Sequence, residues 1–158
     1  MKTHDLDKIR SYVHFSIGNE NFAVNVNRVL EILHLSQLTH VPNASEYIKG
    51  ILNFRGAIVP VINLQKRFNF NEHISEGKMV IVIEVMLNDN IILMGLLVEE
   101  VSDVIEFEYK DIQTVPDTGI KYNPDFLEGF VEINGRFMMI LNVDRVMSVS
   151  ELAEVTEA

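Results

Sequence analysis

The feature that most constrains this chain is an internal repeat. The stretch from Glu46 to Leu64 and the stretch from Asp125 to Val143 carry the same pattern at a spacing of 79 residues. Three pairs of positions agree, with apolar residues in the same phase between them: Gly50 with Gly129, Gly56 with Gly135, and Asn63 with Asn142. Such a repeat predicts two similar modules, because each copy carries the residues for the same local structure.

A weaker repeat precedes each copy. The stretch from Val24 to Ile32 resembles the stretch from Leu96 to Val104. These spacings are longer than those of solenoid repeats, so they indicate a duplicated module. Each half has room for about five short strands, the size of a small β-barrel, and halves this small gain stability by packing on each other.

The distribution of apolar residues predicts mainly β structure. Short alternating or continuous apolar runs are separated by turns rich in glycine and asparagine, which is typical of β-hairpins. The strongest of these turns is Asn134-Gly135, because both residues tolerate the positive φ angles of a type I′ turn. The expected strands are 12–17, 22–26, 50–54, 57–62, 79–87, 91–98, 101–107, 126–133 and 136–141.

Few helices are expected, and they are short. Asn27 is predicted to cap a helix that ends at Leu33. Pro60 cannot donate a ladder hydrogen bond, so its strand is expected to lie at a sheet edge or to carry a bulge. The other expected elements are one or two helical turns at 64–68, a loop at 115–124 and a terminal helix from Asn142 onward.

Charge and cysteine content exclude several classes of protein. The chain carries 13 Lys and Arg against 23 Asp and Glu, a net charge of −10, which argues against a nucleic-acid partner. No cysteine is present, so neither a disulfide framework nor a thiolate metal site is expected. The first residues lack the apolar segment of a signal peptide, and the apolar run from Ile91 to Val98 is too short to cross a bilayer.

The sequence shows no arrangement of residues that would form an active site, so no catalytic residue, metal ligand or cofactor is expected. The five histidines are scattered and form no paired metal-binding motif. Glu99 and Glu100 are neighbours in an expected strand, so their carboxylates would point to opposite sides. Asn88-Asp89-Asn90 lacks the glycine and the distant glutamate of a calcium loop, and is better explained as a turn.

The two copies differ in charge. The first contains four cations and no acidic residue between Lys49 and Arg67, whereas its counterpart is slightly acidic. Arg55 stands where the second copy has Asn134, although arginine has no advantage in a turn with positive φ. Two explanations remain open: Arg55 is an interface anchor that can hold a carboxylate, or it is a solvated side chain in a different type of turn.

Four valines occupy matching places in the two halves: Val26, Val29, Val101 and Val104. They are expected near the junction of the modules. Either they form part of the core between the modules, or they line a groove that accepts an amphipathic helix.

An ordered set of motifs resembles the CheW family of chemotaxis coupling proteins from about Tyr12 to Met147. The motifs are Arg28-Val29-Leu30-Glu31-Ile32, Val41-Pro42-Asn43, Tyr47-Ile48-Lys49-Gly50, Asn53-Phe54-Arg55-Gly56, Val59-Pro60-Val61-Ile62, Gly95-Leu96-Leu97-Val98-Glu99, Val101-Ser102-Asp103-Val104, Phe126-Leu127-Glu128-Gly129 and Ile140-Leu141-Asn142-Val143. The chain departs mildly from the family pattern at Ser45, Phe54, Asn63 and Glu99.

The resemblance implies a mainly β fold of two SH3-like five-stranded β-barrels packed around a shared core, with short connecting helices and a C-terminal helix. One domain would cover 10–150, with barrels at about 20–85 and 90–140 whose terminal segments could be exchanged. Residues 1–9 and 151–158 would be flexible termini. Gly50, Gly56, Gly129 and Gly135 would be structural turn residues.

The resemblance also implies a non-catalytic adaptor between a CheA-type histidine kinase, through its regulatory domain, and the cytoplasmic tip of a methyl-accepting chemoreceptor. It would be cytoplasmic and recruited to membrane-associated receptor arrays, without inserting into the membrane. Val26, Val29, Val101 and Val104 would line the receptor groove, and Glu31 and Arg55 would be charged coupling residues. The alternative from another functional class is a sensor that binds a small molecule between the barrels.

Overall fold

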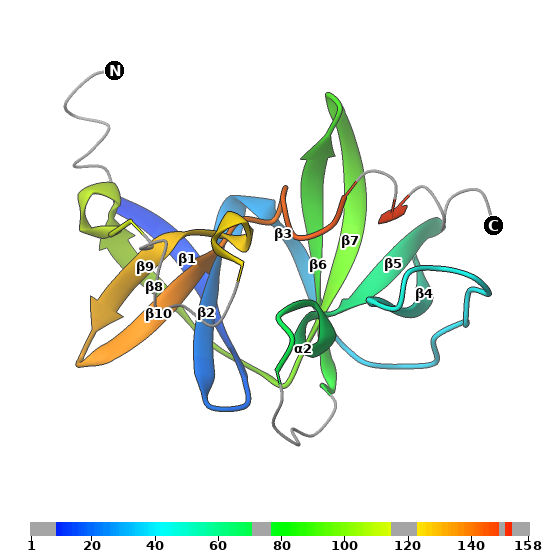
Figure 1. Ribbon diagram of the computed structural model, residues 1–158, viewed down its shortest axis with the longest axis horizontal. Coiled ribbons are helices and arrows are strands. Elements are labelled where there is room, and N and C mark those ends of the chain that lie inside the picture. Colours follow the sequence, from blue (N-terminus) through cyan, green and yellow to red (C-terminus); the bar gives the residue numbers. More distant parts are fainter. Residues whose placement is uncertain (1–8, 71–76, 115–122, 149–150, 153–158) are drawn as a thin grey trace.

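The computed structural model describes residues 9–70, 77–114, 123–148 and 151–152. These residues form two five-stranded sheets that lie side by side, which confirms the mainly β prediction (Figure 1). The first sheet contains, in spatial order, β8 (Glu100–Glu108), β1 (Ile9–Ile17), β2 (Glu20–Asn25), β10 (Arg136–Leu141) and β9 (Leu127–Ile133). The second contains β3 (Val29–His34), β6 (Met79–Leu87), β7 (Asn90–Val98), β5 (Ala57–Asn63) and β4 (Ile48–Phe54).

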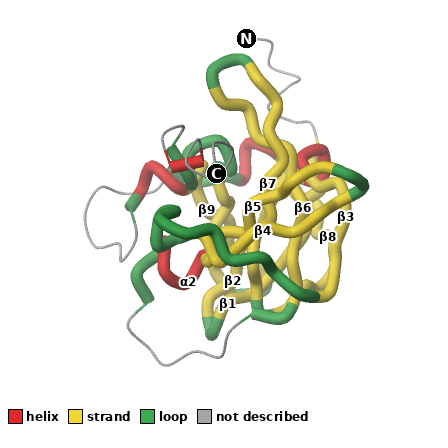
Figure 2. Tube along the Cα trace, turned by 90° about the vertical axis from the view of Figure 1, so that its right-hand side faces the viewer, coloured by secondary structure: helices red, strands yellow, loops and turns green. Residues whose placement is uncertain are grey.

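Short helical turns connect the strands. They are η1 (Val26–Arg28), α2 (Leu64–Arg67), η2 (Tyr109–Asp111) and η3 (Pro124–Phe126). The β6–β7 hairpin projects beyond the rest of the described chain, as two views at right angles show (Figures 1 and 2). Its apolar strands are buried on both faces over most of their length, as their continuous apolar runs predict.

The two halves of the chain exchange their first hairpins. β2 runs parallel to β10, and β7 runs parallel to β5, so each hairpin completes the sheet that the other half begins. The division at about 20–85 and 90–140, with terminal segments that could be exchanged, stays a prediction, but β7 lies in the second sheet and β2 in the first. The cause is the pairing of β6 with β7 along all nine residues of both strands, which keeps the hairpin together.

Three apolar clusters organise the interior. One lies within the first sheet and includes Phe107 and Val131, and another lies within the second and includes Val59. The largest cluster takes residues from both sheets. Stacked rings cross it, with Phe22 and Phe68 at a centroid distance of 5.1 Å. The two sheets thus share a core, as expected, whereas closure of each sheet into an SH3-like barrel remains a prediction.

The predicted helix from Asn27 to Leu33 is wrong. A single 3-10 turn forms instead, in which Asn25 Oδ1 accepts a hydrogen bond from Asn27 N at 2.8 Å. Val29 onward is then strand β3, because it pairs with β6 over several residues. Short apolar runs fit helical and extended spacing equally, and here tertiary pairing decides the outcome.

Two further expectations need correction. Pro60 is in β5, which is not an edge strand, so the first of the two expected alternatives is wrong. The β4–β5 pair does carry a register shift, between Ile48 and Gly50, and pairing of β5 with β7 begins only at Val61, so the missing N–H of Pro60 is not required there. The segment from Asn142 to Ser148 forms turns rather than a helix, and Glu151 and Leu152 are the helical residues described after it. The expected loop at 115–124 falls mostly outside the described residues, as do the termini 1–8 and 153–158.

The four glycines of the repeat have two different roles. Gly56 and Gly135 lie in hairpin turns with φ of 86° and 78°, as expected. Gly50 and Gly129 are not turn residues, because they lie inside β4 and β9. A Cβ at Gly50 would lie 2.9 Å from the Thr39 carbonyl oxygen, and a Cβ at Gly129 would overlap the carbonyl oxygen of the segment that crosses β9. These two positions need glycine because another stretch of backbone passes close by.

Candidate protein-interaction surface

The junction between the sheets begins at η1, which leads from β2 of the first sheet into β3 of the second. Val26 and Val29 flank this turn, and both are half-buried and pack against the shared core. Pairing with Ile83 of β6 fixes the position of Val29. Both valines are therefore held on rigid backbone at the boundary between the sheets.

The other two predicted groove residues lie on β8. This is an edge strand, and it pairs only with β1, through Phe15 opposite Val101 and Val13 opposite Val104. Val101 packs against the same shared core as Val26 and Val29, whereas the side chain of Val104 is 57% exposed. The structure thus brings three of the four valines onto one cluster and leaves Val104 accessible.

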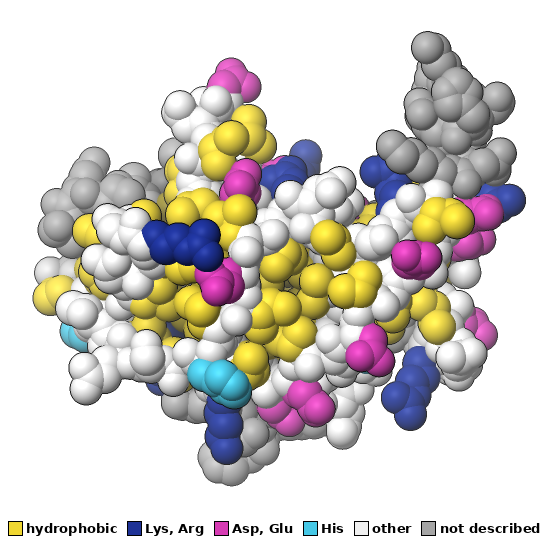
Figure 3. Space-filling model, turned by 180° about the vertical axis from the view of Figure 1, so that it is seen from behind, with side chains coloured by type: hydrophobic (Ala, Val, Ile, Leu, Met, Phe, Trp, Pro, Cys, Tyr) yellow, Lys and Arg dark blue, Asp and Glu magenta, His cyan; other side chains and the backbone are white. Residues whose placement is uncertain are grey.

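Further apolar side chains are exposed on the second sheet and were not identified from the sequence. Leu30 and Ile32 of β3 and Ile58 of β5 are 42%, 39% and 65% exposed. Apolar side chains gather across the middle of the face that Figure 3 shows. If 29–34 had been predicted as a strand, Leu30 and Ile32 would have been predicted to share one face, opposite to that of Val29 and Glu31, because alternate residues of a strand point to opposite sides. Ile58 could have been found from its repeat partner Phe137, which is also exposed.

Glu31 and Arg55, the predicted coupling residues, form an ion pair. Arg55 Nη2 donates to Glu31 Oε2 at 2.8 Å, and the two side chains are 74% and 38% exposed. The Arg55 guanidinium also lies 4.8 Å from the ring centroid of Phe54. A pair this exposed contributes little to stability, on the order of 1 kcal/mol or less. The Arg55 guanidinium nevertheless stays accessible to a partner.

The backbone at Arg55 adopts the conformation of its repeat partner. The φ angle is 53° at Arg55 and 52° at Asn134, and a glycine with positive φ follows each. The explanation that Arg55 occupies a different type of turn is therefore wrong. An arginine held in the left-handed region at an exposed hairpin tip is a sign of function, because asparagine or glycine would fit that backbone with less strain.

Arg28 connects the two sheets through polar contacts. Its guanidinium donates to Asp144 Oδ1 at 3.0 Å and Oδ2 at 2.6 Å, and to the Glu84 carbonyl oxygen at 2.9 Å. Met86 N donates to Asp144 Oδ1 at 2.8 Å. Asp144 follows the last strand of the first sheet, while Glu84 and Met86 belong to β6 of the second. No pattern in the sequence indicates this contact, because its partners are distant in the chain.

Arg67 belongs to the cationic stretch but is mostly buried. Its Nε donates to the Val146 carbonyl oxygen at 2.5 Å, and Nη1 donates to Glu151 Oε2 at 3.1 Å. The guanidinium also lies between the rings of Tyr47 and Phe126, at 4.6 and 4.7 Å from their centroids. Arg67 therefore anchors the C-terminal segment and is not part of a free basic surface.

Glu151 is the acidic partner in this cluster. Burial alone would raise the pKa of its carboxyl group, but hydrogen bonds from Ser148 and the nearby Arg67 outweigh that effect and lower the pKa below the ordinary value. Ser45, a departure from the family pattern, donates its Oγ to Glu151 Oε2 at 3.5 Å. The acidic residue thus joins three segments.

Glu99, another departure from the family pattern, has a structural contact. Its Oε2 accepts a hydrogen bond from Gly18 N at 3.0 Å, which ties the β1–β2 turn to the junction of β7 and β8.

Within the described ranges no group of His, Cys, Asp and Glu is placed to hold a metal ion. No helix among those residues is long and apolar enough to span a bilayer.

Known proteins with this arrangement are chemotaxis proteins. The chain is 29% identical over 146 residues to the chemotaxis protein CheW of Klebsiella aerogenes, covering 92% of this chain and 86% of that protein. It is 30% identical over 142 residues to the chemotaxis protein CheW of Rhizobium meliloti, covering 90% of each. The crystal structure of scaffolding protein TtCheW from Thermoanaerobacter tengcongensis matches with a TM-score of 0.80 and 26% identity over 96% of both chains.

A family model agrees with these relatives. It is described as the CheW-like domain and matches residues 11–151, which include both sheets. The match also contains every residue predicted for the groove and for coupling. The chain therefore belongs to the CheW-like family.

Proposed function

We propose that this chain couples chemoreceptors to a CheA-type histidine kinase by binding a receptor tip at the junction of its two sheets. The role of chemotaxis adaptor is that of the family, and a solved relative is named a scaffolding protein. The observation that carries the choice of site is the convergence of Val26, Val29 and Val101 on the shared core. Exposed Val104 continues this apolar surface toward solvent.

An apolar junction of this kind suits a helical partner. An amphipathic helix buries residues spaced three and four apart, so it needs a groove with apolar sides on rigid backbone. β3 and β8 supply such sides, because each is an edge strand held by a single neighbour. A receptor tip that forms a helical hairpin would place one apolar stripe here.

The kinase contact is assigned to the Glu31–Arg55 region. The pair contributes little to stability, yet Arg55 occupies an unfavourable backbone conformation at an exposed tip next to exposed Ile58. An arginine beside an apolar side chain is a typical interface anchor. We further propose that the chain has no catalytic activity and works in the cytoplasm, transmitting receptor state through geometry.

A direct test is retention of the full chain by an immobilised receptor tip and by the kinase regulatory domain. Val104→Asp places a charge in the proposed groove and is expected to abolish receptor retention. Ile91→Asp is the matched control, because Ile91 is 63% exposed on the projecting hairpin and does not belong to the shared core cluster. Arg55→Ala should weaken kinase retention and leave receptor retention intact.

Two results would contradict the proposal. If the immobilised receptor tip retained the Val104→Asp variant as well as the unchanged chain, the groove would not be the receptor site. Equal kinase binding by Arg55→Ala and the unchanged chain would remove the coupling assignment. Circular dichroism of each variant checks that the sheets remain folded, which is expected because the side chains of Val104 and Arg55 are mainly exposed.

A further inference from the structure

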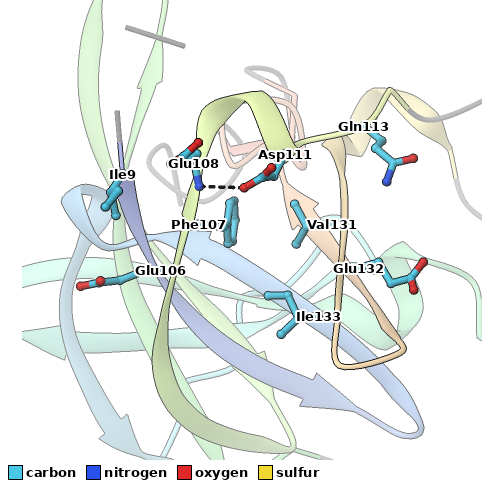
Figure 4. Close-up of a pocket in the computed structure, with 9 residues that line it drawn as sticks. All are labelled: Ile9, Glu106, Phe107, Glu108, Asp111, Gln113, Val131, Glu132 and Ile133. Atoms are coloured by element: carbon cyan, nitrogen blue, oxygen red, sulfur yellow. Dashed lines mark hydrogen bonds between the residues drawn. The ribbon is translucent and has the colours of Figure 1, made fainter. Parts of the chain in front are cut away.

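The first sheet is left open along one seam. β8 and β9 are its two terminal strands, and among the described residues they are joined only through a bridge between β9 and the segment that follows β8. There Gln113 N donates to the Phe130 carbonyl oxygen at 2.8 Å, and Phe130 N donates to the Gln113 carbonyl oxygen at 3.0 Å. Beyond this bridge the two strands separate around a cavity of about 640 Å³ (Figure 4).

The floor of this seam is apolar. Phe107 of β8 and Val131 of β9 belong to the core cluster of the first sheet, and Ile133 packs against it. In the close-up these side chains lie between the two strands, with Ile9 on the far side (Figure 4). Phe107 and Val131 are themselves buried, so the apolar surface that the seam leaves accessible comes from half-buried Ile133 and from Ile9, which is 60% exposed.

The rim of the seam is acidic. Glu106 and Glu132 alternate with the floor residues and are exposed, so they lie on the outer face of their strands. Glu108 and Asp111 line the same cavity, and Asp111 Oδ2 accepts a hydrogen bond from Glu108 N at 3.2 Å. The described lining contains no lysine or arginine.

The gap between the terminal strands of the second sheet has a different lining. Its terminal strands β3 and β4 are also bridged near one end, by Thr39 and Ile51. The leucines that pack there against the sheet's own core are Leu33, Leu35, Leu38 and Leu52. The connection after β3 thus supplies two leucines as apolar cover, Leu35 and Leu38, whereas the described connection after β8 supplies one apolar residue to its core, Ile112, and adds Asp111 to the rim.

We propose that the open seam binds an extended segment of a partner protein in which lysine or arginine alternates with apolar residues. A strand added to the free edge of β8 or β9 would complete the ladder, and its inward side chains would pack on the accessible lining residues Ile9 and Ile133. Its outward side chains would lie beside Glu106 and Glu132, where cations make favourable cross-strand pairs. This site shares strand β8 with the proposed receptor groove but uses Glu106 and Phe107 in place of Val101 and Val104, and the proposal does not rest on that groove.

The test uses a fluorescent peptide of about nine residues, the length of a strand, that alternates lysine and valine. Anisotropy measures its binding to the full chain. A peptide with glutamate in place of lysine and a peptide N-methylated at alternate residues, which cannot pair with a strand edge, are the controls. Only the unmodified lysine peptide is expected to bind.

Variants locate the site. Glu106→Lys/Glu132→Lys should weaken binding about tenfold or more, because two attractive pairs become repulsive. Glu46→Lys/Glu100→Lys makes the same change in net charge at exposed positions outside the cavity and should change affinity less than about twofold, through screened charge alone. Equal losses in both double variants would overturn the proposal, as would undiminished binding of the N-methylated peptide. The proposal would also be overturned if the chain formed a dimer that required Glu132 and that prevented the peptide from binding. In that case the seam would be the contact between two copies of the chain.

Discussion

At the scale of single residues, Arg55 occupies a backbone conformation that lowers stability and that its ion pair does not offset. Its φ of 53° is costly for a side chain that is neither glycine nor asparagine, and its ion pair with Glu31 is too exposed to offset much of that cost. The repeat partner Asn134 shows the residue that local structure alone would choose. Local structure therefore does not explain Arg55, which is an argument for the binding role proposed for it.

This explanation predicts the effect of Arg55→Asn. The substitution relieves backbone strain of about 1 kcal/mol and loses a weaker ion pair, so the free energy of unfolding should stay constant or rise by up to about 1 kcal/mol. Urea denaturation measures the change. Glu31→Gln, which removes the pair and leaves the turn unchanged, is the control. A fall of more than about 1 kcal/mol in Arg55→Asn would mean that the pair stabilises the hairpin.

Glu151 predicts a dependence of stability on pH. Its pKa is lower in the folded chain than in the unfolded chain, so its stabilising effect is complete above the ordinary glutamate pKa and is lost as the pH falls through the folded pKa. Glu151→Gln should therefore lower the melting temperature near pH 7 and narrow the difference from the unchanged chain below about pH 4. Thermal melts across this range measure both effects. A constant difference at every pH would contradict the lowered pKa.

At the scale of elements, periodicity identified nearly every strand, because alternation and asparagine–glycine turns are local signals. It failed at β3, whose run Val29-Leu30-Glu31-Ile32-Leu33 fits a helix as well as a strand. The pairing partner that decides between them, β6, is distant in sequence. Val29 and Val101 of the junction could be found because the duplication aligns them, whereas the Arg28–Asp144 contact has no counterpart in the repeat pattern.

The glycines inside strands give a prediction at this scale. Gly129→Ala would push a Cβ into the Gln113 carbonyl oxygen, so it should lower the free energy of unfolding by about 2 to 3 kcal/mol. Gly135→Ala meets no atom within 4 Å and carries only the strain of its positive φ, about 1 to 2 kcal/mol. Chemical denaturation of both variants ranks them. The reverse order would show that the crossing segment can move aside.

At the scale of the whole molecule, the two sheets are joined by a shared core and by Arg28. Asp144→Asn keeps the shape of the side chain but removes the charge that holds Arg28 and weakens acceptance from Met86 N. Because both charged side chains are about one third exposed, the expected loss is about 1 to 2 kcal/mol.

Hydrogen exchange is the measurement that locates this effect. The Met86 amide should exchange faster in Asp144→Asn, while amides in the middle of β6 keep their protection. Asp103→Asn, an exposed carboxylate on β8, is the control and should leave the Met86 amide unchanged. Unaltered exchange at Met86 in Asp144→Asn would show that the carboxylate does not hold this strand.

The exchange of hairpins has a consequence for how the chain is made. The second sheet uses only residues between Val29 and Val98, so all of its strands are available once Val98 has left the ribosome. The hairpin of β1 and β2 is synthesised first, yet its neighbours β8 and β10 emerge last. During that interval the apolar side chains of Phe15 and Phe22 lack half of their final surroundings. Of the strands of the first sheet, β1 and β2 are thus translated before the strands that flank them, and they are where a nascent chain would most need a chaperone.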